Sequence, residues 1–131
     1  SNQSNSDHID DGLKLKNVYI TAALKCVPPE DKPLKIELDN CSKYFDKELE
    51  LLKNLKVIVA LGKIAFDACK YFYKKKYNFY ENINFGHGKI YKLPSGILLV
   101  GCYHPSPRNV NTGRIDENKM VNLFIKVKNL I

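Results

Sequence analysis

The sequence lacks a long hydrophobic run, an apolar segment near its first residue, and any pair of closely spaced cysteines. A membrane-spanning helix needs about 20 consecutive apolar residues, so the sequence predicts no membrane partner. The polar stretch 1–12 contains no apolar signal-peptide core, and we expect it to be an irregular lead-in. These features predict an intracellular, cytoplasmic protein.

The four cysteines have two interpretations, because no close C-x-x-C pair marks a self-contained metal site. In a reducing compartment, metal ligation or buried thiols are more common than disulfides. Cys26 follows a predicted strand and Cys41 lies on the inner face of a predicted helix, so they could be half of a four-cysteine cluster site. Two buried structural thiols are the alternative, which spacing alone favours. Cys69 and Cys102 are predicted to be core residues.

The chain has 131 residues, which fits a single domain. Hydrophobic residues make up 44% and charged residues 27%, as in a globular protein. Lysine and arginine number 21 against 14 acidic residues, giving a net charge of +7. This surplus favours a polyanionic partner, either nucleic acid or an anionic membrane surface.

Alternating hydrophobic patterns predict strands and helices in turn along the chain. Strands alternating with helices indicate a three-layer α/β/α sandwich with a mostly parallel central sheet. Asp116 is predicted to cap the last helix. The run of three lysines at 74–76 is predicted to be a solvated helix end. The predicted strands are 18–24, 57–61, 89–93 and 97–103; the predicted helices are 34–53, 63–76 and the segment after Asp116; the predicted loops are 73–84 and 104–114.

His104 follows the most apolar predicted strand, at the start of a loop stiffened by Pro105 and Pro107. Ligands of open parallel sheets bind beyond the carboxyl ends of the strands. An imidazole there could donate a hydrogen bond to a developing anion. The alternative is a histidine that only ends a strand and bonds to backbone.

Two further segments have a functional and a plain structural interpretation. The loop from Ser106 to Arg114 is polar and basic, so it could follow a phosphate backbone or enter a duplex. It could equally be a surface loop that ends in a helix cap. His87 stands between two glycines, in a segment that is either a turn or a ligand contact.

Taken together, these segments resemble the iron–sulfur uracil-DNA glycosylases in order and spacing over nearly the whole chain. The resemblance is strongest to family 5, also called type B, with family 4 next. Family 4 usually has an asparagine that contacts uracil where this chain has Ala22, which favours family 5 and a looser choice of base. The matching segments are 19–29 with 32–33 and Cys41, 57–62 with Ala65, 85–88, 103–107 and 109–114.

The resemblance implies a role for each matching residue. His104 would be the catalytic group that faces the flipped base and stabilises the departing anion. Thr21, Ala22 and His87 would line the substrate pocket. Cys26 and Cys41 would be two of the four ligands of a [4Fe–4S] cluster. The DNA-binding residues would be Ser106, Pro107, Arg108, Asn109, Asn111, Thr112 and Arg114.

The implied function is a DNA-repair hydrolase that removes uracil, and perhaps other deaminated bases, by base flipping. Its partner would be damaged DNA in the nucleoid, and we expect the full-length protein to be a monomer. The resemblance also implies that residues 1–131 are the C-terminal portion of one domain. The N-terminal part, with two cluster cysteines and the water-positioning residue, would then be missing. Two alternatives are a non-catalytic nucleic-acid-binding module and a degenerate iron–sulfur structural subunit.

Overall fold

The computed structural model describes the backbone of residues 2–3, 5–23 and 35–131, and the side chains of these residues except 35–41. No helix among the described residues is long and apolar enough to cross a membrane. The elements, in chain order, are α1 (Lys35–Leu51), β1 (Val57–Leu61), α2 (Lys63–Tyr77), β2 (Ile90–Lys92), a 3-10 turn (Pro94–Gly96), β3 (Leu98–Cys102), α3 (Pro107–Asn111) and α4 (Glu117–Asn129).

The described sheet has three strands in the order β1-β3-β2. β1 runs parallel to β3, with Ala60 opposite Gly101, and β2 runs antiparallel to β3, with Ile90 opposite Val100. The sheet predicted to be mostly parallel is therefore mixed in the described part. The antiparallel ladder arises because a tight turn at 94–96 joins β2 to β3, and a short turn can connect only antiparallel neighbours.

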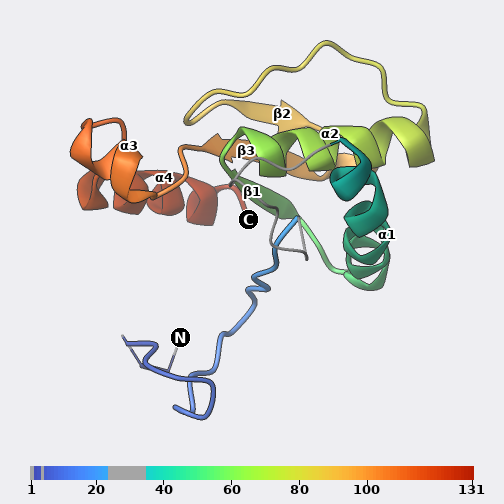
Figure 1. Cartoon of the computed structure of the whole chain (residues 1–131). Helices are drawn as coiled ribbons and strands as arrows, with labels where there is room; N and C mark the ends of the chain where they lie inside the picture. The colour runs from blue at the N-terminus through green and yellow to red at the C-terminus, as the bar shows by residue number, and fades with distance from the viewer. Residues whose placement is uncertain (1, 4, 24–34) are drawn as a thin grey trace.

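Helices cover both faces of this sheet, which confirms the three-layer α/β/α class (Figure 1). Side chains alternate along β3: Leu99 packs with the residues of α1 and α2, whereas Val100 and Cys102 pack with Leu123 of α4. A strand buried on both faces in this way reads as a continuous apolar run. The residues from Leu98 to Cys102 show that pattern.

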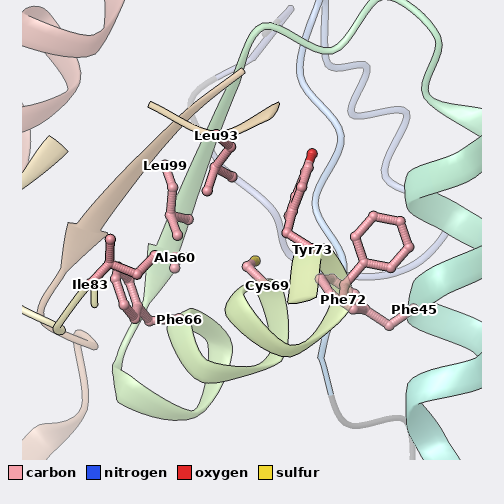
Figure 2. Packing of buried hydrophobic residues seen from close by; sticks show 9 residues of the cluster. All are labelled: Phe45, Ala60, Phe66, Cys69, Phe72, Tyr73, Ile83, Leu93 and Leu99. Carbon is pink, nitrogen blue, oxygen red and sulfur yellow. The ribbon is translucent and has the colours of Figure 1, made fainter. Parts of the chain in front are cut away.

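The larger core lies between the sheet and the two N-terminal helices, where Phe45 of α1 reaches Phe72 of α2 (Figure 2). Phe66 is fully buried and meets the rings of Phe85 and Tyr91 edge to face, with centroids 5.8 and 5.9 Å away. Burial of one such side chain stabilises the fold by about 1.5–3 kcal/mol. Ion pairs from the end of α2 to α1 complete the contact, Lys75 to Asp46 and Lys76 to Glu50.

The predicted strand 18–24 is wrong for the residues that the structure describes there, 18–23. They form neither helix nor strand, and Val18, Tyr19 and Ile20 are 60%, 57% and 73% exposed. A β-branched and aromatic run favours a strand only when a neighbouring strand receives its hydrogen bonds. In the described sheet, neither β1, β2 nor β3 pairs with this run. Leu24 lies outside the described residues.

The other elements are close to their predicted bounds, with two differences. The predicted loop 73–84 begins too early, because α2 continues to Tyr77 and ends at Asn78 in the left-handed conformation, with φ 52°. Asparagine tolerates this conformation and commonly ends helices. The predicted loop 104–114 contains the short helix α3. The described part of 1–12 is irregular, as predicted.

Candidate functional site

His104 lies just past the carboxyl end of β3, beside the end of β1. The backbone N–H of Gly62 donates to the carbonyl of Cys102 at 2.8 Å, which joins the two parallel strands at this edge. The Cβ of His104 lies only 3.2 Å from the point that a Cβ on Gly62 would occupy. Gly62 also has a φ of +92°, a conformation that favours glycine.

The imidazole of His104 is exposed, and among the described residues no hydrogen bond or ion pair engages it. Its backbone carbonyl, in contrast, accepts from Ser106 N–H at 2.8 Å and from the Asn109 amide at 2.8 Å. The backbone of His104 is thus fixed while its ring remains available. A ring held in this way can donate a hydrogen bond to a ligand.

Asn109 organises the turn that follows His104. Its backbone N–H donates to the Ser106 hydroxyl at 3.3 Å, and its own carbonyl accepts from the Arg114 N–H at 3.0 Å. Ser106 is therefore the N-cap of α3, with Pro107 in the first turn, an arrangement that suits a helix start. Of the two interpretations of this loop, the cap is observed, and contact of Ser106 with phosphate remains a prediction.

The residues predicted to touch DNA form one contiguous turn beside His104. Thr112 closes α3 by donating from its hydroxyl to the Arg108 carbonyl at 2.8 Å. The side chains of Arg108 and Arg114 are exposed, and in the described part of the chain neither forms a salt bridge. Two unpaired guanidinium groups on a fixed turn can bind phosphate oxygens.

His87 lies against the residue that precedes His104. Its ring stacks on Tyr103, with centroids 5.1 Å apart and planes 15° apart, and its Nδ1 accepts from the Tyr103 N–H at 3.1 Å. Burial, and then the nearby Lys119 cation, lower the pKa of His87 below its usual value. The neutral tautomer that accepts at Nδ1 carries its proton on Nε2, where it can act as a donor.

A close contact between Gly86 and Gly101 lets the segment that contains His87 lie against β3. A Cβ on Gly101 would lie 2.4 Å from the carbonyl oxygen of Gly86, so only glycine fits at this point in the strand. The Gly88 N–H then donates to the Gly101 carbonyl at 2.8 Å. Gly101 thus allows the glycine-flanked turn of His87 to reach the strand end.

The structure does not bring Thr21 and Ala22 to His104 through any described contact. The Thr21 hydroxyl donates instead to Glu48 of α1, and Ala22 is exposed. Their place in a substrate pocket remains a prediction. The described site consists of His104, the turn after it, and His87.

The two predicted cluster ligands, Cys26 and Cys41, have side chains outside the described part of the structure. Cys26 lies outside the described residues, and so does the side chain of Cys41, although its backbone belongs to α1. The described residues contain no group of three or more histidine, cysteine or acidic side chains placed to bind a metal. The assignment of Cys26 and Cys41 as cluster ligands stays a prediction.

The other two cysteines are buried in the core, as predicted. Burial raises the pKa of Cys69 to about 12 and also raises the pKa of Cys102. Cys69 packs in the core that includes Phe66 and Phe72, whereas Cys102 packs with Val100 and Leu123 in the other core. Both thiols therefore act as apolar core groups on opposite faces of the sheet.

Sequence reasoning missed Gly62, Tyr103 and Lys119 as neighbours of the two histidines. Gly62 directly follows an apolar strand, and a glycine at that position is a recognisable signal that another segment approaches the backbone closely. Tyr103 and His87 come from separate segments, so no spacing links them. Lys119 belongs to a polar stripe along α4, with Asn122 and Lys126 at helical spacing.

Comparison with known proteins identifies the family of this chain. Residues 3–128 match the family model described as the Uracil DNA glycosylase superfamily. A Type-5 uracil-DNA glycosylase of Thermus thermophilus is 38% identical over 120 residues, which cover 92% of this chain and 53% of the relative. A Type-5 enzyme of Pyrobaculum aerophilum is 39% identical over 115 residues, covering 88% and 48% respectively.

A more distant relative is a Type-4 uracil-DNA glycosylase of Archaeoglobus fulgidus. It is 29% identical over 99 residues, which cover 72% of this chain and 48% of the relative. The chain thus spans about half the length of the curated relatives that it matches. The order of similarity, Type 5 before Type 4, is the one that the sequence motifs predicted.

Proposed function

The chain belongs to the uracil-DNA glycosylase superfamily, and from this premise we propose that the protein hydrolyses the N-glycosidic bond of deoxyuridine in DNA. The proposal concerns the whole protein, since the chain covers about half the length of the Type-5 relatives. Its central support is the unengaged imidazole of His104, held at the carboxyl ends of β1 and β3 beside an arginine-bearing turn.

In the proposed reaction, His104 acts on the leaving base. Cleavage of the C1′–N1 bond leaves its electron pair on uracil, as an anion whose charge is shared between N1 and the carbonyl oxygens, while water forms the new bond to C1′. A fixed donor aimed at such a charge contributes about 2.7–4 kcal/mol to the transition state. The backbone of His104 is held by Ser106 and Asn109, so little reorganisation is needed when the charge appears.

The base must leave the duplex before His104 can reach it, at a cost of a few kcal/mol. We propose that the turn from Pro107 to Arg114 offsets this cost by entering the minor groove. Arg108 and Arg114 would neutralise phosphates on either side of the gap, with Asn111 and Thr112 adding polar contacts. Ser106 can offer a phosphate its hydroxyl proton while its oxygen continues to accept from Asn109 N–H.

We further propose that Cys26 and Cys41 are two of the four ligands of a [4Fe–4S] cluster. Such a cluster would supply metal–sulfur bonds that cross-link α1 to the segment containing Cys26, a structural role. No chemical step on the base is assigned to it. The buried thiols Cys69 and Cys102 take no part.

The proposed partner is DNA that contains uracil, within the cytoplasm and nucleoid, and the proposed active form is a monomer. Ala22 stands where family 4 has its uracil-contacting asparagine. A small apolar side chain imposes no hydrogen-bond requirement on the base. We therefore propose that hypoxanthine and xanthine are also removed.

The test is an excision assay with the protein encoded by the complete gene. A labelled duplex with one central uracil is incubated with enzyme and then treated with alkali, which cleaves the strand at abasic sites. The proposal predicts cleavage at the uracil position by the wild type and its loss in His104→Ala. Tight binding of the same duplex without base release would indicate a nucleic-acid-binding module instead.

A further inference from the structure

A second cleft lies on the α4 side of the sheet, separate from His104. It has a volume of about 250 Å³, and its floor is apolar, formed by Ile90, Val100 and Leu123. Its rim carries His87, which also borders the candidate site, together with Lys119 and Lys126. The proposed reaction gives no role to the two lysines or to the apolar floor.

The rim of the cleft carries two positive charges, the ammonium groups of Lys119 and Lys126, beside the imidazole of His87. No carboxylate is among the described residues that line the cleft. Lys119 is close enough to His87 to disfavour a second positive charge on the imidazole. Two ammonium groups with no carboxylate beside them in the lining attract an anion, so the cleft is suited to negative charge.

His87 can also contribute a directed donor. Since its Nδ1 accepts the Tyr103 N–H, the neutral ring carries its hydrogen on Nε2. The stack on Tyr103 fixes the plane of the ring. One oriented N–H and two flexible ammonium groups are a donor set that matches a phosphate.

One hydrogen bond and one chain connection link this cleft to the proposed DNA-binding turn. Lys119 Nζ donates to the carbonyl of Gly113, inside the turn, at 2.8 Å. Tyr103, on whose ring His87 stacks, immediately precedes His104 in the chain. A polynucleotide held by the turn would therefore pass close to the cleft.

We propose that this cleft binds one sugar–phosphate unit of the DNA strand outside the flipped nucleotide. Lys126, Lys119 and His87 hold the phosphate, and the apolar floor of Ile90, Val100 and Leu123 receives the carbon face of the deoxyribose. The proposal rests on the proposed function, because it places the cleft along the same bound strand. It extends the DNA footprint from the turn onto α4.

The test compares Lys126→Gln with Lys128→Gln in the protein from the complete gene. Both changes remove one positive charge from the last turn of α4, but Lys128 lines the opposite, apolar flank of that helix. Affinity for a uracil-containing duplex is measured over a salt series. Each phosphate contact contributes about 0.9 to the slope of log affinity against log salt. Lys126→Gln should lower the slope by about this amount, and Lys128→Gln should leave it unchanged.

The proposal is overturned if Lys126→Gln has the same salt slope as the wild type. It is also overturned if Lys126→Gln and Lys128→Gln lower the salt slope by the same amount. A free anion is the other source of a phosphate group, so a second arm titrates inorganic phosphate while the His87 imidazole signals are followed by NMR. If phosphate moves those signals but Lys126→Gln leaves the DNA slope intact, the cleft binds free anions and the assignment to DNA fails.

The excision assay separates failure of this proposal from failure of the proposed function. A wild-type protein that excises uracil, with a Lys126→Gln variant of unchanged salt slope, refutes only the cleft. A wild-type protein that neither binds nor cleaves the uracil duplex refutes both.

Discussion

His104 is packed against Gly62, with its Cβ 3.2 Å from the place that a Cβ on residue 62 would take. Gly62 follows β1 and is the N-cap residue of α2, whereas His104 follows β3. The position of the imidazole thus depends on a glycine more than forty residues away in the chain. Any side chain at residue 62 has to move His104 or the backbone that carries it.

The Gly62→Ala variant should lose excision activity and some stability. Alanine at the φ of 92° and ψ of 166° that Gly62 adopts costs about 1–3 kcal/mol, and the added methyl group pushes against His104. We expect a lower melting temperature together with a rate loss larger than instability explains. The measurements are thermal unfolding and single-turnover excision below the melting transition.

Gly96→Ala is the matched control for this variant. Gly96 has a similar φ of +78°, but a Cβ there would meet nothing within 4 Å. We expect a loss of stability from backbone strain, with the excision rate retained. A rate loss of equal size in both variants would show that strain alone, and not displacement of His104, explains the effect.

Asn109→Ala should loosen the turn after His104. The variant loses the hydrogen bond from the side-chain amide to the His104 carbonyl at 2.8 Å, which is worth about 0.5–1.5 kcal/mol. We expect weaker binding of the uracil duplex and slower excision, measured by fluorescence anisotropy and the alkali assay. Asn118→Ala, an exposed position in the first turn of α4, is the control and should behave as wild type.

His87 should make the folded state less stable in acid. Its pKa is lowered by burial from the ordinary 6.5, so the unfolded chain binds a proton that the folded chain resists. Stability is therefore complete above pH 6.5 and declines as the pH falls from 6.5 through the lowered folded value. Urea unfolding at several pH values should show a smaller acid loss in His87→Gln than in wild type. Identical pH profiles would contradict the shift.

The cluster prediction has a direct cysteine test. Cys26→Ser and Cys41→Ser, made in the protein from the complete gene, should abolish the brown colour and the bound iron. Cys69→Ala should keep both, because the Cys69 side chain is buried in the apolar core that includes Phe66 and Phe72. Iron retained in both serine variants would remove these residues from the ligand set.

The sequence predicted the elements whose patterns are strong and local. The apolar run from Val57 to Leu61 and the Asp116 cap of α4 both occur as expected, and the cap accepts from Lys119 N–H at 2.8 Å. The layer arrangement follows from the alternation of these elements. The position of His104 at the strand ends followed from the general rule for parallel sheets.

Contacts between distant segments could not be predicted in this way. The run from Val18 has strand propensity, but a strand also needs a partner, and the described sheet offers it none. The stack of His87 on Tyr103 depends on a close approach at Gly101 that no periodicity reveals. The stripe of Lys119 and Lys126 was hidden because the apolar positions of α4 dominate its pattern.

The most direct test of the account is the single-turnover excision rate of His104→Ala in the protein encoded by the complete gene, with DNA affinity measured in parallel. Loss of a donor worth about 2.7–4 kcal/mol predicts a rate lower by about 10²–10³-fold, with affinity for the uracil duplex nearly unchanged. An excision rate equal to that of the wild type would contradict the central claim that this imidazole stabilises the departing base.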